Sequence, residues 1–423
     1  MIVATRPLRS LFLTLLALLA LFGAAARAFE ARDLGTEDFE ISDVYQHGDM
    51  DKPEEFGHLD IRRVLKRVAQ LRAAGQHVPR GDAEIADRMD EFRYSGLRKV
   101  SHPTATEEFP EYYVDTILDI EPEEANTMSL PNVKDKATVL ELAKMTSNAY
   151  YSSSESKEWY TLPTYGKPAM SFGWSGNALR GYVYTNASKS VAVIDFKGTS
   201  LSFLGIGGPT SANDKIIDNR MFSCCCARVS SGWKTVCDCY RGNGSDNKCS
   251  NSCLRSAMQN DSLSYYKAAL NIYNQVRSKY PKATVWFTGH SLGGSLASLL
   301  SVKTGYPAVP YHAPGELLYG QRLGLPINTG NMGAYKIWHF GSTADPIFRG
   351  TCKGAASACA VAGYALETGC HIGNECIYTG GVENVNNHRI SVVIDKYISP
   401  KPVPACKPAP SKCNDCSQWT WVS

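Results

Sequence analysis

The sequence predicts an α/β fold in which helices cover both faces of a mostly parallel sheet, with disulfide-rich insertions. A helix predicted over residues 261–279 leads into a strand at the start of 285–302, and that stretch ends in a second helix. Further strand patterns lie at 170–174, 181–184, 191–196 and 335–340. Helices that alternate with apolar strands are typical of parallel sheets buried on both sides. The hydrophobic content of 43% is ample for such a core.

The first 28 residues predict entry into the secretory pathway. Arg6 and Arg9 precede an apolar run at 11–22, and Ala26-Arg27-Ala28 resembles a signal-peptidase site. The run is 12 residues long, or 16 with the small residues that follow, whereas a membrane-spanning helix needs about 17–25. We therefore favour a cleaved signal peptide at 1–28 over a type II signal anchor, and both place the rest of the chain in the lumen.

An oxidising lumen makes disulfides the expected state of the 14 cysteines. Seven of them lie within 224–253, so at least one of these needs a partner elsewhere if all are oxidised. The remaining cysteines form groups at 352–376 and 406–416. Cys413-x-x-Cys416 has the spacing of zinc ligands, but no second such pair lies at zinc-finger distance, and we favour disulfides.

The charge and the sequons fit a lumenal protein. The formal net charge of +3 gives no reason to expect a nucleic-acid partner. Asn186, Asn243 and Asn260 each begin an Asn-x-Ser sequon and are candidates for glycosylation.

Two segments flank the predicted main domain at 136–400. Residues 29–135 lack cysteine and are interpreted as an N-terminal lumenal extension. Within it, the pattern of residues 59–74 predicts a basic amphipathic helix. Such a helix either docks on a protein surface or lies on an anionic membrane, and we favour docking. Residues 401–423 form a Pro- and Cys-rich tail, which its three cysteines are expected to tie back.

The stretch 285–302 contains Gly289-His290-Ser291-Leu292-Gly293, the pattern of a nucleophile elbow. A serine on a sharp strand-to-helix turn presents its hydroxyl only if its close neighbours are small, as the glycines here are. Ser291 is therefore the candidate nucleophile. The amide of Leu292, at the start of the helix, is a candidate oxyanion donor.

A second oxyanion donor is predicted at Thr199. The strand 191–196 runs into Phe196-Lys197-Gly198-Thr199, roughly a hundred residues before the elbow, where hydrolases of this type place that donor. The half-apolar stretch 200–222 follows, and we interpret it either as a lid or as a loop buried under its neighbours.

Asp345 and His388 are the candidate acid and base. Asp345 follows a predicted strand and is the only aspartate between Ser291 and His388, although four glutamates are rivals. Of the two histidines after Asp345, His388 stands beside an apolar segment, whereas His371 lies in a cysteine-rich loop. We therefore prefer His388 as the base, in the chain order serine, acid, histidine.

The elbow VWFTGHSLGG and the strand end FKGT resemble the class 3 lipases. The runs MFSCCCARVS, VCDCY, TADPI and GYALETGCHIGNEC are similar to the fungal autophagic lipases within that family. The resemblance covers about 136–400. It implies an α/β-hydrolase fold, a triad on Ser291, Asp345 and His388, and lipase or phospholipase activity on membrane vesicles in the vacuole lumen. It also implies delivery through endosomal vesicles, with the N-terminal segment kept as a type II anchor.

Two alternatives to this function stay open at the sequence level. One is a secreted hydrolase of soluble esters, and the other is a catalytically silent, disulfide-rich lumenal protein that binds lipid. The proposed chemistry needs no metal and no organic cofactor. Membrane phospholipids and vesicles are the expected partners, and the sequence indicates no protein partner.

Overall fold

The computed structural model describes residues 43–46, 57–78 and 128–423, apart from gaps at 175, 177, 201–209, 231–232, 234, 244–245, 262 and 423. The chain divides into two compact units, residues 1–41 with 65–108 and residues 42–64 with 109–423. The predicted signal segment at 1–28 lies outside the described residues. Within the described ranges, no helix has the length and apolar character needed to cross a bilayer.

A short hairpin and a helix precede the main sheet along the chain. Strands β1 (Asp43–Gln46) and β2 (Gly57–Asp60) pair antiparallel, and helix α2 (Ile61–Ala73) follows. In α2, Val68 is buried while Lys66 and Arg67 are exposed, so the helix has the apolar and basic sides that the sequence predicts.

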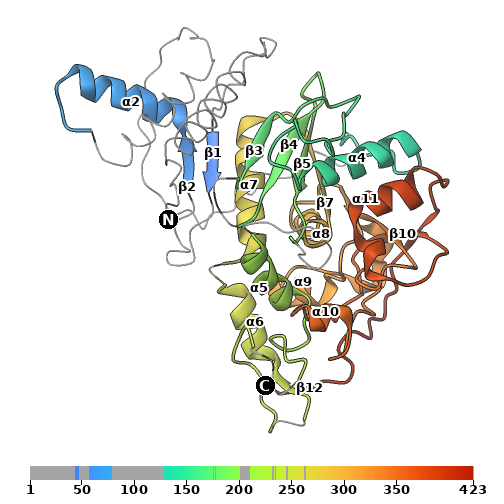
Figure 1. Ribbon diagram of the computed structural model, residues 1–423. Helices are drawn as coiled ribbons and strands as arrows, with labels where there is room; N and C mark the ends of the chain where they lie inside the picture. Colours follow the sequence, from blue (N-terminus) through green and yellow to red (C-terminus); the bar gives the residue numbers. More distant parts are fainter. Residues whose placement is uncertain are drawn as a thin grey trace, which may run out of the picture. The chain divides into compact units, whose positions relative to one another are not determined.

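An eight-stranded mixed sheet organises the second unit (Figure 1), in the order β11-β10-β9-β8-β7-β5-β4-β3. The central strands β10, β9, β8, β7 and β5 run parallel, whereas β11, β4 and β3 pair antiparallel with their neighbours. The strands are β3 (Met170–Phe172), β4 (Gly181–Thr185), β5 (Val191–Phe196), β7 (Thr284–His290), β8 (Ala308–Tyr311), β9 (Trp338–Ser342), β10 (Asn374–Tyr378) and β11 (Cys406–Pro408).

Strand β5 is apolar apart from Asp195 because both faces of the sheet are covered there. In β5, Ile194 and Phe196 face one hydrophobic core, and Val191 and Val193 face the other. Successive side chains of a strand point to opposite faces, so a strand buried on both sides loses the alternation of polar and apolar residues.

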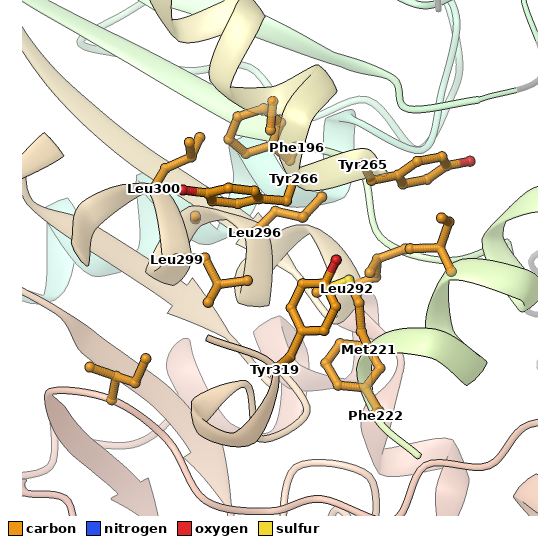
Figure 2. Close-up of a cluster of buried hydrophobic side chains, with 14 of the residues drawn as sticks. Phe196, Met221, Phe222, Tyr265, Tyr266, Leu292, Leu296, Leu299, Leu300 and Tyr319 are labelled. Atoms are coloured by element: carbon orange, nitrogen blue, oxygen red, sulfur yellow. The ribbon is translucent and has the colours of Figure 1, made fainter. Parts of the chain in front are cut away.

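Helices α7 (Tyr265–Lys279) and α8 (Leu292–Thr304) pack in the first core, and α4 (Lys136–Asn148) and α11 (Ile390–Val393) pack in the second. In Figure 2, Tyr319 lies among Leu292, Leu299 and Phe222 in the first core. The remaining helices and helical turns are α5 (Ser211–Met221), α6 (Asn251–Gln259), α9 (Leu317–Leu323), α10 (Ala358–Val361), η2 (Thr329–Ala334), η3 (Val385–His388) and η4 (Ile394–Ile398).

The candidate lid at 200–222 is described only in part. Residues 201–209 lie outside the described residues. The second half is helix α5, in which Ile217 and Met221 are buried in the first core. This half is therefore buried under its neighbours, as the second interpretation expects, but it is a helix and not a loop.

All 14 cysteines are paired in seven disulfides, as the sequence predicts. The odd cysteine of the 224–253 group is Cys224, which pairs with Cys416. The other pairs are Cys225–Cys249, Cys226–Cys237, Cys239–Cys253, Cys352–Cys359, Cys370–Cys413 and Cys376–Cys406. The tail beyond residue 400 thus carries one partner of three disulfides. It also supplies β11 to the main sheet and β12 (Thr420–Val422), which pairs with β6 (Lys248–Ser250).

Candidate active site

The turn between β7 and α8 has the geometry of a nucleophile elbow. Ser291 adopts φ 58° and ψ −128°, a conformation that L-residues rarely take. The glycines around it are required sterically. A Cβ on Gly289 would lie 2.4 Å from the carbonyl carbon of Gly293, and a Cβ on Gly293 would lie 2.0 Å from the carbonyl oxygen of Phe196. The start of α8 therefore packs directly against the end of β5.

Three side chains from separate parts of the chain form a hydrogen-bonded row at this turn. Ser291 Oγ lies 2.8 Å from His388 Nε2, and His388 Nδ1 lies 2.7 Å from Asp345 Oδ2. Asp345 follows β9, and His388 ends η3, which follows β10. Because β7, β9 and β10 are parallel, their carboxyl ends meet at one edge of the sheet, and the three side chains meet there.

The carboxyl group of Asp345 is held in its ionised form. Burial opposes ionisation, but the charge of His388 and the hydrogen bonds from His312 and His388 outweigh that cost and hold the pKa of Asp345 well below its usual range. Its other oxygen, Oδ1, accepts the N–H of Ile347 at 2.9 Å. Asp345 is fully buried, so this carboxylate is fixed in orientation by its three donors.

Two histidines that the sequence analysis did not select stand beside His388. His312, just after β8, has Nδ1 at 2.7 Å from the same Oδ2 of Asp345 that faces His388. His290, the last residue of β7, has Nε2 at 2.6 Å from the carbonyl oxygen of His388. Neither histidine has a sequence signal for such a role, since one lies inside the elbow motif and the other follows a strand of four residues.

His290 links His388 to Tyr150, which follows the end of α4. The carbonyl oxygen of His388 only accepts, so His290 Nε2 carries the proton and His290 Nδ1 accepts from the Tyr150 hydroxyl at 2.7 Å. Burial lowers the pKa of His290 well below its usual value, and repulsion from a charged His388 adds to this. A neutral His290 is the form that can donate and accept in this way.

The predicted oxyanion donors lie beside the elbow. A Cβ on Gly198 would lie 3.1 Å from Ser291 Cβ, so the backbone leading into Thr199 runs directly past the serine. Thr199 Oγ1 donates to Asp218 Oδ2 of α5 at 2.7 Å, which fixes the residue. The N–H of Leu292 is the first amide of α8, and such amides have no partner within their own helix.

A buried lysine ties the same strand end to α5. Lys197 Nζ donates to the Gly198 carbonyl oxygen at 2.8 Å and to Ser200 Oγ at 2.7 Å, and it lies 3.4 Å from Asp214 Oδ2. Burial lowers the pKa of Lys197, and the carboxylate of Asp214 partly offsets this effect. These contacts of Lys197 therefore fix the position of the backbone at Gly198 and Thr199.

His371, the rival base, belongs to a different network. Its Nδ1 lies 2.9 Å from Glu375 Oε1, and its Nε2 lies 3.0 Å from the carbonyl oxygen of Ala313. Burial opposes the charge on His371, but the hydrogen bond to Glu375 and the field of Glu316 raise its pKa to about 8. Both ring nitrogens of His371 therefore belong to a network separate from Ser291 and Asp345.

The asparagines of the three sequons are at least partly exposed. Asn243 and Asn260 are exposed. Asn186 lies in the turn between β4 and β5, where its Nδ2 donates to Ser190 Oγ at 2.9 Å and its Oδ1 accepts from the N–H of Val191 at 3.1 Å. A glycan on Asn186 would replace one of those amide protons.

Residues 143–317 match a protein family described as a Tle-like phospholipase domain. The chain is 47% identical over 309 residues to "Putative lipase ATG15" of Eremothecium gossypii, which covers 70% of this chain and 56% of that protein. Proteins of the same name in Saccharomyces cerevisiae and Yarrowia lipolytica are each 43% identical, over 74% and 69% of this chain. The chain spans between 54% and 63% of the length of these three relatives.

Solved structures show a weaker likeness. Lipase II from Rhizopus niveus is 18% identical, with a TM-score of 0.30, and covers 59% of this chain and 84% of its own. A triacylglycerol lipase from Penicillium expansum is 15% identical with the same TM-score, over 66% of this chain and 95% of its own. At these TM-scores the likeness carries no argument, and the fold rests on the sheet order and the elbow. The chain has an α/β-hydrolase fold and belongs to the family of the fungal proteins named "Putative lipase ATG15".

Proposed function

We propose that the protein is a serine lipase or phospholipase that hydrolyses acyl esters of membrane glycerolipids, with Ser291 as nucleophile, His388 as base and Asp345 as the orienting acid. The observation that carries the proposal is the continuous row from Ser291 Oγ through His388 to Asp345 Oδ2, with hydrogen bonds of 2.8 and 2.7 Å. An isolated serine is a weak nucleophile, and a base oriented by a third group is what activates it.

In the first half-reaction, His388 Nε2 takes the proton of Ser291 as Oγ attacks the ester carbonyl carbon. The negative charge moves to the carbonyl oxygen, where the amides of Leu292 and Thr199 stabilise it by about 3–4 kcal/mol per donor in comparable sites. The tetrahedral intermediate then collapses. His388 returns the proton to the departing alcohol oxygen, and the acyl group stays on Ser291.

In the second half-reaction, His388 takes a proton from water, and the resulting hydroxide attacks the acyl-serine. Collapse of the second intermediate releases a fatty acid and restores the Ser291 hydroxyl. Protein groups transfer the protons and stabilise the oxyanion, so water is the one reactant that these steps need besides the ester.

We propose membrane lipids in an acidic, oxidising lumen as the setting, with the vacuole as the compartment. The family match to a phospholipase domain and the relatives named as lipases support a lipid substrate. The predicted secretory segment and the seven disulfides support a lumenal location. Disintegration of vesicles and autophagic bodies follows as the proposed role, since hydrolysis of their phospholipids removes the bilayer.

The proposal is tested by incubating the protein with phosphatidylcholine vesicles and measuring the free fatty acid released. The wild type should release fatty acid and should be labelled by a fluorophosphonate probe, because the probe reacts only with an activated serine. Ser291→Ala should not be labelled, and its rate of fatty acid release should be at least about 10³-fold below that of the wild type. Undiminished release by this variant would refute the role of Ser291.

The same assay separates the alternatives. A silent lipid-binding protein would neither release fatty acid nor take up the probe. A hydrolase of soluble esters would take up the probe but would act faster on dispersed short-chain esters than on vesicles. Preference for the vesicle substrate is the expected result for a lipase.

A further inference from the structure

We propose that His312 is a positioning residue for the reaction, because its Nδ1–H holds Asp345 Oδ2 and divides that oxygen between two imidazoles. The proposal rests on the proposed roles of Ser291, His388 and Asp345. The geometry that motivates it is symmetrical: Asp345 Oδ2 lies 2.7 Å from Nδ1 of His388 and 2.7 Å from Nδ1 of His312.

The surroundings of His312 define its protonation state. A carboxylate oxygen only accepts, so Nδ1 of His312 must carry a proton to bond with Asp345. Its Nε2 is buried and has no hydrogen-bond partner among the described residues. An N–H buried without an acceptor is costly, and a bare lone pair is the less costly alternative. His312 is therefore the neutral Nδ1–H tautomer. Burial also lowers its pKa, against the pull of Asp345.

A neutral donor suits this position better than a cation. The ring centroids of His312 and His388 are 6.4 Å apart, and His388 becomes positively charged during each half-reaction. A cationic neighbour at that distance would oppose the charge on His388. Neutral His312 keeps Asp345 oriented without that penalty.

His312 has an unusual backbone conformation. Its φ is +46°, in the left-handed region that few residues other than glycine, asparagine, aspartate and histidine occupy. Its N–H donates to the carbonyl oxygen of Phe340 at 2.7 Å, so the turn after β8 is fixed to β9. From this fixed turn the ring of His312 reaches Asp345.

Sharing the oxygen has a consequence for pH dependence. An oxygen that already accepts one N–H attracts a second proton donor less strongly, so His312 weakens the hold of Asp345 on the His388 proton. Without His312, the hydrogen bond from His388 Nδ1 to Asp345 Oδ2 should become stronger. The titratable groups that face His312 are Asp345, His388 and Tyr397, with His290 beyond His388 and His371 behind Phe348.

The test compares two substitutions in the full-length protein, with kcat and KM measured on a soluble 4-nitrophenyl ester between about pH 5 and 8. His312→Leu removes the donor. It should lower kcat about 10- to 100-fold with KM nearly unchanged, and move the acid limb of the profile upward by roughly one pH unit. His312→Asn places an amide N–H where Nδ1 stood and tolerates the left-handed backbone. It should keep kcat within about threefold and leave the limb in place.

The matched control is His371→Asn, which removes a buried histidine that bonds Glu375 rather than Asp345. It should leave the acid limb where it is. Equal losses in the leucine and asparagine variants, or an unmoved limb in His312→Leu, would show that His312 only fills space. Full activity of Ser291→Ala would instead refute the proposed function, so the two failures are distinct.

A second measurement needs no variant and no activity. Nitrogen-15 NMR of the wild-type protein with labelled histidine reports which ring nitrogen carries the proton. His312 should show the neutral Nδ1–H tautomer across the whole pH range of the assay. The Nε2–H tautomer, or a doubly protonated ring, would overturn the proposal even if His312→Leu failed to fold.

Discussion

At the scale of single residues, the protein buries an acid that has no hydrogen-bond partner in the described part of the chain. Asp195 lies on β5, fully buried, and neither of its carboxyl oxygens accepts a hydrogen bond there. Burial alone raises the pKa of Asp195 well above its usual value. The folded state therefore favours the protonated acid, whereas the unfolded chain ionises near the ordinary value of about 4.

The first prediction concerns Asp195→Asn. A pKa raised in the folded state makes the unfolding free energy fall as pH rises from about 4, by up to roughly 1.4 kcal/mol per unit, until the folded-state pKa is reached. The amide has no such dependence. The variant should therefore gain stability over the wild type at pH 7.5 and gain less at pH 5, as measured by urea denaturation. An equal difference at both pH values would show that Asp195 does not titrate on unfolding.

At the scale of elements, the elbow requires the backbones of α8 and β5 to touch. The start of α8 packs against the end of β5, since Gly293 has no room for a Cβ next to Phe196. The same contact brings the amide of Leu292 towards the strand end that carries Thr199. This contact between helix and strand therefore helps to bring the two proposed oxyanion donors near each other.

The second prediction is that Gly293→Ala separates those segments. The new methyl group would lie 2.0 Å from the Phe196 carbonyl oxygen, so α8 must shift. Activity per folded molecule should fall at least about 100-fold, since the loss of one oxyanion donor alone costs that much. Fluorophosphonate labelling rates on purified, folded protein measure the effect.

The control lies at the other end of the same helix. Gly305 has φ +75°, and a Cβ added there would have no atom within 4 Å. Alanine at this position would therefore strain the backbone but would not clash with a neighbouring atom. Gly305→Ala should lose about 1 kcal/mol of stability and keep its labelling rate. A similar rate in both variants would mean that the contact at Gly293 is not needed for the chemistry.

Elements with strong local patterns were predictable, and those defined by long-range contacts were not. Helix α7, strand β7 and helix α8 follow each other with clear periodicity and turn residues, and the sequence locates all three. Strand β8 has four residues including Pro310, and β10 lies inside a cysteine-rich stretch, so neither has a recognisable pattern. His312 was missed for this reason: its role depends on β8 lying beside β9, which the sequence does not indicate.

At the scale of the whole molecule, disulfides connect segments that the sheet alone does not. Cys224–Cys416 joins residues 192 positions apart, whereas Cys352–Cys359 joins residues only 7 apart. If a disulfide acts mainly by restricting the unfolded chain, the longer loop stabilises more, about 5 against about 2.5 kcal/mol.

The third prediction follows from that difference. Replacing Cys224 and Cys416 together by alanine should lower the thermal midpoint clearly more than replacing Cys352 and Cys359. Calorimetry under non-reducing conditions measures both midpoints. The reverse order would show that local packing, and not loop length, determines what each disulfide contributes.

The pairing of Cys224 has a consequence for biosynthesis. The other six cysteines of the 224–253 group have partners within that group, but Cys224 cannot form its disulfide until Cys416 has been synthesised. For that interval a reactive thiol stands next to Cys225 and Cys226, where thiol–disulfide exchange can scramble the neighbouring bonds. Cells that produce this protein should therefore depend on a disulfide isomerase. A chain in which each cysteine paired with the next one along the sequence would depend on it less.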